Sequence, residues 1–394
     1  MKMKVVAIKS IADVSSGNTP SRRKSEYWNG SIPWITTGEL ESGYVTASKE
    51  CVTEKALKET ALKLYHKGTV LIAMYGQGKT RGTAAVLGIE ATVNQACAAL
   101  TVHGGCSKFL FYQLQNSYHA IRRLSNTGNQ ENLNAEIIKN FKILWPDELE
   151  QQKIAAILST QDKVIELKEK LLAQKQQQKK YLMQQLLTGK LRLPDVNGEW
   201  TSVKLKELLI ERNEKNVEQN HRICSVAVSK GVVDQIEHLG RSYAAADTSN
   251  YGVAHYGDII YTKSPTGDFS LGIIKQNRMR ENVAISPLYG IYKPISFSTG
   301  YLLNIYFEST INTKNYLTPI VQKGAKNTIA ISNSAFLENK IFFPMDEATQ
   351  SRIAKVFELT DHEIDLLQKS IEAEKQKKKA LMQLLLTGKV SVRI

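Results

Sequence analysis

The sequence predicts an α+β fold: two globular domains of mixed α/β structure, separated by two long antiparallel coiled-coil helices in a pseudo-twofold arrangement. Its 394 residues are too many for one ordinary core and fit two domains of about 150 residues each. A long helix-forming segment occurs twice, and each copy follows a stretch of short β-like runs. We therefore expect the order globule, helix, globule, helix.

The helix prediction rests on an internal repeat. Residues 151–190 and 350–389 align without a gap and are identical at 18 of 40 positions. Neither segment contains proline, and their glycines, Gly189 and Gly388, lie in a final LTGK at the position of helix C-cap residues. A helix of this length would extend about 60 Å at 1.5 Å per residue. We expect helices over residues 150–187 and 349–386 that act as spacers.

Apolar residues follow a seven-residue step along both segments. Leu158, Ile165 and Leu172 are spaced in this way, and apolar residues stand at the aligned positions of the second segment. Such a step is typical of the seam of a coiled coil. The seam predicts that the long helices pack along a shared apolar face.

The two globular segments echo each other in outline. Each has a glycine-bounded β-like run, at residues 68–75 and 257–263, followed by a turn and a further short strand. Each segment ends in an apolar strand closed by Pro146 or Pro344. The expected domains are residues 1–149 for the first globule, 150–194 for the central helix, 195–348 for the second globule and 349–394 for the C-terminal helix.

The charge balance points to a polyanionic partner. Lysine and arginine outnumber acidic residues 52 to 38, which gives a net charge of +14 and a pI near 9.4. Nucleic acid is the first expectation and an anionic membrane the second. We find no apolar run of signal-peptide or membrane-helix length, so we expect a cytoplasmic protein. Two similar globules with different loops would read two unlike half-sites of one duplex.

Several strings resemble the specificity subunits of type I restriction–modification enzymes. They are SSGNTPSRRKSEYWNGSIPWITTGEL (15–40), GTVLIAMYGQGKTRGTAAVLG (68–88), GDIIYTKSPTGDFSLGI (257–273) and the two long helices. The resemblance covers essentially the whole chain, although VAVSKGVV (226–233) stands where the second globule would repeat the first pattern. It implies that each globule is a target-recognition domain for one half of an asymmetric bipartite DNA target. The helices would set the gap between the halves.

The resemblance also implies partners and cofactors. The chain would bind double-stranded DNA and two adenine-N6 methyltransferase subunits, and through these two ATP-driven restriction subunits. S-adenosylmethionine, ATP and magnesium would belong to the partners, with no cofactor in this chain. The long helices would dock the methyltransferase subunits, through the apolar residues Ile154, Ile157, Leu158, Ile165, Leu172, Leu182, Ile353, Phe357, Ile364, Ile371 and Leu381.

One motif favours a different class of protein. Residues 73–80, which end in Gly78, Lys79 and Thr80, satisfy a relaxed phosphate-binding-loop pattern, so an NTPase is an alternative. A true loop of this kind is followed by a helix whose N-terminus holds the phosphates. The next residues, RGTAAV from Arg81, instead read as a turn and a strand. We favour a DNA-contacting loop here, with a solvated turn as the other alternative.

Base reading requires side chains with paired donors and acceptors, while lysine, serine and threonine anchor phosphates. In the first globule the candidates are Asn18, Thr19, Ser21, Arg22, Arg23, Gln77, Lys79, Thr80, Arg81, Asn129 and Gln130. In the second globule they are Ser229, Lys230, Lys263, Ser264, Thr266, Arg278, Arg280, Lys323, Lys326 and Asn327. For each of these residues, simple solvation is the alternative.

The sequence gives no support for catalysis. It contains no NPPY-like methyltransferase motif, no catalytic arrangement among its histidines and no metal-site spacing among its four cysteines, so we assign no catalytic or metal-binding residue. The tryptophans are expected in packing instead of base stacking. The lysine run at 375–379 is expected to be the solvated face of a helix, with a DNA-lining role as the alternative. A coiled-coil protein that binds nucleic acid without sequence preference remains an alternative function.

Overall fold

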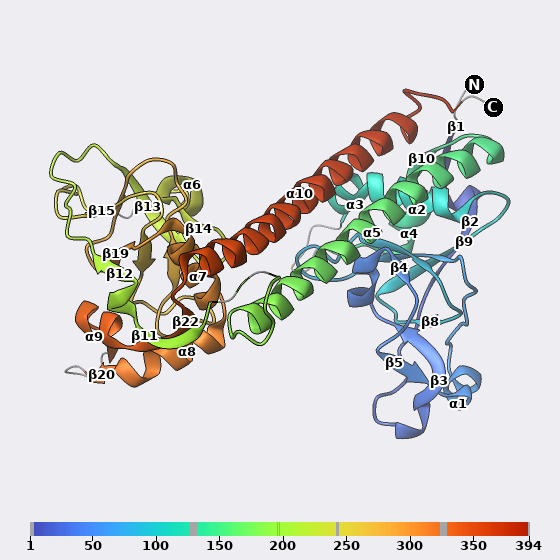
Figure 1. Cartoon of the computed structure of the whole chain (residues 1–394). Helices are drawn as coiled ribbons and strands as arrows, with labels where there is room; N and C mark the ends of the chain where they lie inside the picture. Colours follow the sequence, from blue (N-terminus) through green and yellow to red (C-terminus); the bar gives the residue numbers. More distant parts are fainter. Residues whose placement is uncertain are drawn as a thin grey trace. The chain divides into compact units, whose positions relative to one another are not determined.

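Two compact units make up the chain (Figure 1). The computed structural model describes residues 4–125, 132–194, 196, 198–241, 244–323 and 329–392. Unit 1 comprises residues 1–170 and 368–394, and unit 2 comprises residues 171–367. Each unit therefore contains one globule and a part of each long helix.

The two long helices are α5 (Glu148–Leu186) and α10 (Glu347–Leu385), each of 39 residues. Before α5, Asp147 Oδ1 accepts a hydrogen bond from the Glu150 amide at 2.9 Å, and Asp346 makes the equivalent bond at the start of α10. Gly189 and Gly388, just beyond the helices, have φ angles of 69° and 71°. The structure confirms the two predicted helices to within two residues at each end.

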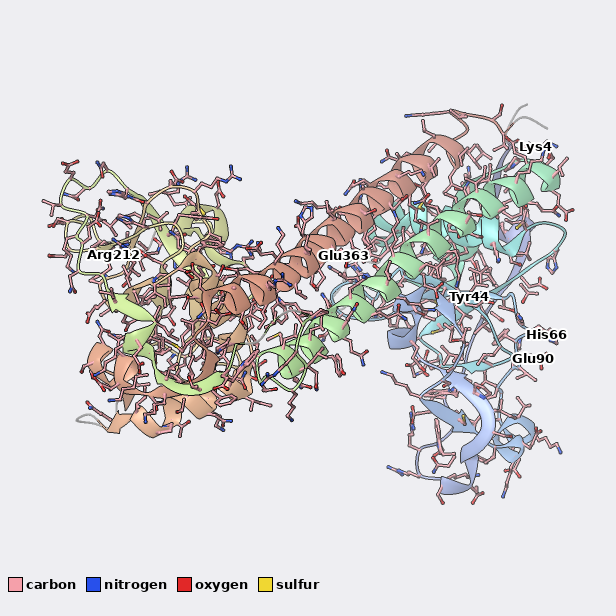
Figure 2. All side chains as sticks on the ribbon, viewed as in Figure 1. Lys4, Tyr44, His66, Glu90, Arg212 and Glu363 are labelled. Carbon is pink, nitrogen blue, oxygen red and sulfur yellow. The ribbon has the colours of Figure 1, made fainter. Side chains whose placement is uncertain are left out.

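In each unit the two helix segments run antiparallel. The ion pairs that join them are Asp162–Lys378, Lys168–Glu374 and Glu169–Lys375 in unit 1, and Lys175–Glu363 and Lys179–Asp361 in unit 2. Figure 2 shows Glu363 on α10. Lys375 and Lys378, from the lysine run of α10, are thus engaged with α5. These ion pairs account for part of that run without DNA.

A five-stranded sheet lies at the centre of the unit 1 globule. Its strands, in spatial order, are β2 (Ala12–Ser16), β9 (Cys97–Val102), β6 (Val70–Ala73), β7 (Ala84–Leu87) and β4 (Tyr44–Val45). Strand β9 pairs antiparallel with both β2 and β6, and β6 pairs antiparallel with β7. Helix α2 (Ser107–Asn116) packs on β6 and β7.

The unit 2 globule repeats this arrangement. Its central sheet has the order β12 (Leu209–Glu211), β19 (Gly290–Pro294), β16 (Ile259–Tyr261) and β17 (Ile274–Gln276), with antiparallel pairing throughout. Helix α7 (Phe297–Phe307) packs on β17 and β19. The order and strand directions match those of β2, β9, β6 and β7, so the two globules share one plan.

Smaller sheets complete each globule. In unit 1 these are β1 (Lys4–Ala7) with β10 (Lys142–Trp145), and β5 (Glu50–Val52), β3 (Trp28–Ile35) and β8 (Thr92–Val93). In unit 2 they are β11 (Trp200–Lys204) with β22 (Lys340–Pro344), β14 (Gly231–Asp234), β13 (Arg222–Ala227), β18 (Val283–Ile285) and β15 (Gly252–Ala254), and β20 (Gln322–Lys323) with β21 (Ile329–Ala330).

Short helices fill the remaining connections. The α-helices are α1 (Glu54–Glu59), α3 (Tyr118–Arg123), α4 (Ala135–Asn140), α6 (Gln235–Leu239), α8 (Thr310–Leu317) and α9 (Asn333–Glu338). The 3-10 helices are η1 (Ile8–Ser10), η2 (Ser25–Tyr27), η3 (Thr37–Ser42), η4 (Leu205–Glu207) and η5 (Thr318–Ile320). Within the described ranges, the helices lack the apolar length needed to span a bilayer.

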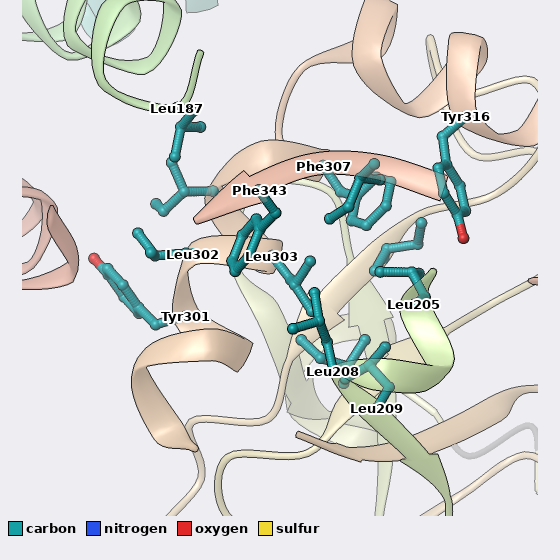
Figure 3. Close-up of a cluster of buried hydrophobic side chains, with 14 of the residues drawn as sticks. Leu187, Leu205, Leu208, Leu209, Tyr301, Leu302, Leu303, Phe307, Tyr316 and Phe343 are labelled. Atoms are coloured by element: carbon teal, nitrogen blue, oxygen red, sulfur yellow. The ribbon is translucent and has the colours of Figure 1, made fainter. Parts of the chain in front are cut away.

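The core of each globule is completed by the end of the long helix that starts at the other globule. In unit 2, Leu187, just after α5, packs with Phe343 of β22 and Leu302 of α7 (Figure 3). In unit 1, Leu386, just after α10, joins the core, and Gln113 Nε2 donates to its carbonyl oxygen at 3.0 Å. Each globule therefore depends on a helix end from the other sequence repeat.

A Tyr–Asp–Lys cluster fixes the helices to the unit 1 globule. Tyr112 Oη, on α2, donates a hydrogen bond to Asp162 Oδ2 on α5 at 2.7 Å. Lys378 Nζ, on α10, lies 2.6 Å from Asp162 Oδ1. Burial, together with Asp162, raises the pKa of Tyr112, so this hydroxyl keeps its proton and remains a donor. One aspartate thus joins the globule to both helices.

Unit 2 contains the same cluster with the two helices exchanged. Tyr301 Oη, on α7, donates to Asp361 Oδ2 on α10 at 2.6 Å. Lys179 Nζ, on α5, lies 2.7 Å from both Asp361 Oδ1 and Glu308 Oε2. In the sequence repeat, Asp361 aligns with the aspartate of the unit 1 cluster and Lys179 with its lysine. The repeat therefore encodes two equivalent attachment points.

Candidate nucleic-acid interface

Two polar loops leave the same edge of the unit 1 sheet. Because β2 and β6 both pair antiparallel with β9, they run in the same direction, and their last residues face the start of β9. Ser16 lies opposite Ala98, and Ala73 lies opposite Cys97. The segments that follow, residues 17–27 and 74–83, therefore start at the same end of the sheet, on either side of β9. The structure thus places the two candidate groups, at 18–23 and 77–81, beyond the same end of the sheet.

The loop after β2 is tied down at several points. Trp34 Nε1 donates to the carbonyl of Asn18 at 3.0 Å, and Trp28 Nε1 donates to that of Ser21 at 3.2 Å. A Cβ on Gly17 would lie 2.1 Å from the Val93 carbonyl oxygen, so this close approach requires glycine. The predicted packing role of these two tryptophans is confirmed, because Trp34 belongs to a buried apolar cluster and Trp28 packs against it.

The candidates on this loop differ in their surroundings. Ser21, Arg22 and Arg23 are exposed, whereas Asn18 and Thr19 are half-buried. The Thr19 hydroxyl donates to Gln95 Oε1, and the Asn18 side chain accepts from the Thr19 amide at 2.9 Å. The exposed part of the loop is therefore its arginine-containing end.

Residues 74–83 form the connection of a β-hairpin. Strand β7 pairs antiparallel with β6 immediately after this loop. No helix follows Lys79 and Thr80, and so no helix N-terminus is aimed at a phosphate. This geometry excludes the phosphate-binding loop that the sequence pattern suggested.

Side chains of helix α3 hold the hairpin loop by hydrogen bonds to the backbone of the loop. Tyr118 Oη donates to the Lys79 carbonyl, and Arg122 Nη1 donates to the Arg81 carbonyl, both at 2.7 Å. Gln77 and Lys79 are exposed and Thr80 is half-buried. Arg81, however, is only 8% exposed, because the chain has already turned back toward β7 at this point. Its prediction as a DNA contact conflicts with this burial.

The matching loop in unit 2 joins β16 to β17. Lys263 has a φ angle of 56°, which is unusual for a residue other than glycine, and is half-buried. Burial lowers its pKa, and Glu211 opposes this shift. Thr266 and Phe269 exchange backbone hydrogen bonds of 3.0 Å, which shape the loop, and Ser264 is exposed. The strained backbone places Lys263 at the base of the loop.

The other unit 2 candidates do not gather at this loop. Arg278 and Arg280 follow β17, at the opposite end of the β16–β17 hairpin. Arg278 Cζ lies 5.2 Å from the centroid of the Tyr301 ring on α7. Ser229 and Lys230, in the turn between β13 and β14, are exposed. The candidates of unit 2 are therefore spread over more than one side of the globule.

Sequence reasoning missed the unit 2 counterpart of the loop after β2. Since β12 occupies the place of β2 in the sheet, the equivalent loop is residues 212–221. Arg212, labelled in Figure 2, forms a bidentate pair with buried Asp258 at 2.6 and 3.1 Å. Lys215 and Gln219 are exposed. The polar run ERNEKNVEQN after LLI was the available clue, although it shares no motif with GNTPSRR.

Some predicted residues lie outside the described part of the chain. These are Asn129 and Gln130 in the first globule and Lys326 and Asn327 in the second. Lys323 lies in β20, but its side chain is not among those described. These five residues stay predictions.

The predicted docking residues of the helices are mainly buried or half-buried within the two units. Ile154, Leu158, Ile353 and Phe357 belong to the globule cores, and Ile165 and Ile371 are buried. Half-buried positions are Leu172, Leu182, Ile364 and Leu381, and Ile157 is exposed. The apolar seam of these residues therefore packs mainly against other parts of the same chain. Exposed leucines, Leu167 at 53% and Leu366 at 51%, stand instead at aligned positions of the repeat.

The described residues contain no group of three or more His, Cys, Asp or Glu side chains that could hold a metal ion. Burial raises the pKa of the Cys97 and Cys224 thiols to about 12, with smaller contributions from nearby acids. These two thiols therefore stay protonated and are poor metal ligands or nucleophiles.

The first part of the chain is similar in sequence to known proteins. Residues 1–176 match the family described as type I restriction modification DNA specificity domain. The chain is 34% identical over 172 residues to the MjaIX specificity subunit of Methanocaldococcus jannaschii, a match that covers 42% of this chain and 39% of the relative. It is 29% identical over 151 residues to the EcoR124I/EcoR124II specificity subunit of Escherichia coli, covering 37% of each. The matches thus span about two fifths of these relatives.

Comparison with solved structures covers nearly the whole chain. The S subunit of the type I restriction-modification system of M. genitalium has a TM-score of 0.62 and 15% identity, over 98% of this chain and 96% of its own. A chain from a structure on complex assembly and conformational transition of the type I R-M system has a TM-score of 0.57 and 13% identity, over 98% and 99%. This likeness shows a shared fold and confirms the predicted α+β class with two long helices.

Proposed function

We propose that the whole chain is the DNA specificity subunit of a type I restriction–modification complex, because residues 1–176 match the family described as type I restriction modification DNA specificity domain. The observation that carries the proposal is the repeated globule. Both central sheets have the same strand order, and in both a polar loop follows each of two strands that run in the same direction. The chain thus presents two reading surfaces of one design.

The two surfaces would read unlike half-targets. Residues 17–27 and 212–221 occupy equivalent places but share little sequence, and so do residues 74–83 and 262–273. Side chains on such loops decide which base edges are contacted. An asymmetric bipartite target follows, with the helices setting its gap.

The helices also support the proposed partners. Leu167 and Leu366 are large exposed apolar residues at aligned positions, one in each unit. Two equivalent surfaces suit two copies of one partner, which we propose to be the adenine-N6 methyltransferase subunit. The restriction subunits would join through it, in the cytoplasm. In this proposal the chain is not catalytic, and S-adenosylmethionine, ATP and magnesium are held by the partners.

Mapping of methylated adenine tests the function. The chain is expressed with its methyltransferase subunit in a host without adenine methylation, and the genome is sequenced for N6-methyladenine. We expect one split motif that is absent when this chain is omitted. Exchange of residues 195–345 for those of another family member is expected to change one half of the motif and leave the other. Methylation without any sequence preference would favour the non-specific coiled-coil alternative.

A further inference from the structure

Arg22, on the loop after β2, combines a fixed position with an exposed charge. Its Cζ lies 3.7 Å from the centroid of the Trp28 ring, and its Nη1 and Nη2 donate to the two carboxylate oxygens of Glu50 at 2.5 and 2.8 Å. The Arg22 side chain is nevertheless 53% exposed and that of Glu50 is 40% exposed. A stacked and paired guanidinium thus faces solvent in one orientation.

The groups that hold Arg22 are themselves fixed. Trp28 packs edge-on against Trp34, with ring centroids 5.0 Å apart, and Trp34 is 3% exposed. Glu50, at the start of β5, lies opposite Trp34 in the β3–β5 register. Ser48 Oγ donates to the Glu50 carbonyl at 2.6 Å. Little conformational freedom therefore remains to be lost when Arg22 meets a ligand.

The pairing with Glu50 leaves a defined edge of the guanidinium open. Glu50 takes one hydrogen from each Nη atom, while Nε–H and the neighbouring second Nη hydrogen point along another edge. Among the described residues, Nε of Arg22 donates to no other group. Two parallel donors of this kind match O6 and N7 of guanine in the major groove. The Glu50 carboxylate keeps lone pairs that could accept from the N4 amino group of cytosine.

We infer that Arg22 and Glu50 together read one G·C base pair in the half-target of the unit 1 globule. Arg22 contacts O6 and N7 of the guanine, and Glu50 accepts from the amino group of the cytosine. This inference rests on the proposed function, namely that this globule reads DNA.

The carboxylate distinguishes base reading from a phosphate contact. A phosphate brought to Arg22 would meet the negative charge of Glu50, which already neutralises the arginine. A base edge carries no net charge and offers both acceptors and a donor. Arg23, exposed and next in the chain, suits a phosphate better.

The test maps the methylated motif for variants of the assembled complex. Arg22→Lys removes the bidentate edge but keeps the charge. We expect it to reduce the preference for a G·C pair at one motif position by about ten- to a hundredfold, with the other positions unchanged. Glu50→Gln is expected to change the preference at that same position. Uniform weakening at all positions would instead identify a phosphate contact and overturn the inference, as would an unchanged motif.

Matched controls come from another exposed ion pair of the unit 1 globule. Lys55 Nζ lies 3.0 Å from Glu26 Oε1, at side-chain exposures similar to those of Arg22 and Glu50. Lys55→Arg and Glu26→Gln are expected to leave the motif unchanged. If the wild-type complex shows no split motif, the proposed function itself fails. A wild-type motif that Arg22→Lys leaves intact removes this inference alone. Thermal unfolding of each purified chain checks that the variants fold.

Discussion

Asp162 on α5 and Lys378 on α10 form an ion pair of 2.6 Å, and Tyr112 of the unit 1 globule donates to the same aspartate. Its counterpart in unit 2 uses aligned residues of the repeat with the two helices exchanged. Each long helix therefore supplies an aspartate to the globule it follows and a lysine to the other globule. Both globules consequently depend on both sequence repeats.

We expect Lys179→Met to destabilise unit 2. The Lys179 side chain is 13% exposed and lies between Glu308 and Asp361. Burial opposes its charge, but the two carboxylates outweigh this effect and raise its pKa. Removing the lysine leaves partly buried Asp361 without this counter-charge and leaves Glu308 with the more distant Lys275 at 3.9 Å, at a cost of about 3 kcal/mol in the free energy of unfolding. Urea unfolding measures this loss.

The control for this variant is Lys175→Met on the same helix. Lys175 pairs with Glu363 at 2.8 Å, but Glu363 is 58% exposed. An exposed pair of this kind contributes less than about 1 kcal/mol. Equal losses for the two variants would contradict the role given to the Tyr–Asp–Lys cluster.

Leu386→Ala is expected to destabilise the unit 1 globule, although Leu386 is far in sequence from the other residues of that core. Leu386 is 1% exposed in the unit 1 core, and truncation of a buried leucine costs about 2–5 kcal/mol. Hydrogen exchange followed by mass spectrometry should show lost protection around Gln113. Leu187→Ala should have the same effect in unit 2, whereas Leu384→Ala, at a 41% exposed position, should have little. Loosening confined to the end of α10 would refute the prediction.

The lowered pKa of Glu374 predicts that the stability of unit 1 depends on pH. It accepts hydrogen bonds from Lys168 at 2.8 Å and Gln161 at 2.7 Å, and these bonds lower its pKa from 4.5 to about 2. Between these values the unfolded chain binds a proton that the folded chain does not, so stability rises with pH across this window. The contribution of Glu374 to stability is complete above the pKa of this group in the unfolded chain. It is lost as the pH falls through the pKa of Glu374 in the folded chain.

Glu374→Gln isolates this contribution. Urea midpoints of the wild type and the variant are compared from about pH 5.5 to about pH 2.5. We expect the advantage of the wild type to shrink toward the acid end of this range. An advantage that is constant across the range would show that Glu374 is not responsible.

Leu167→Arg and Leu366→Arg are each expected to remove one methyltransferase subunit from the complex. The two leucines are exposed at equivalent places, and a buried arginine in the interface would weaken binding by about tenfold or more. Native mass spectrometry counts the bound subunits, and the double variant should bind none. Ile311→Arg, at a 68% exposed position on α8, is the control. Retention of two subunits by the double variant would refute docking at these residues.

Part of the fold could be predicted from sequence because the relevant patterns are long. The helix repeat is identical at 18 of 40 positions, enough to show two equivalent helices. Strands such as β16 and β17 have three residues each, too few to show a period, so the sheet order could not be predicted. The helix ends share the string LLTGK, and an identical string cannot tell which globule receives which end.

The site was predictable by residue type but not by position. Polar composition identified the loops after β2 and β6, while their position at the same end of the sheet depends on the pairing of both strands with distant β9. Arg81 has the side chain of a DNA contact, yet the hairpin turns it inward. The loop at 212–221 carries no recognisable motif, and its place next to β12 is visible only in the folded sheet.

The hydrogen bond from Gln113 to the Leu386 carbonyl joins residues 273 positions apart in the chain. A ribosome therefore synthesises the first globule long before it synthesises the leucines that complete its core. The second globule receives Leu187 from the segment made just before it, and Phe357 of α10, which also belongs to its core, precedes Leu386 in the chain. All residues of the second core are therefore synthesised before the first core can be completed. The order of completion is thus the reverse of the order of translation.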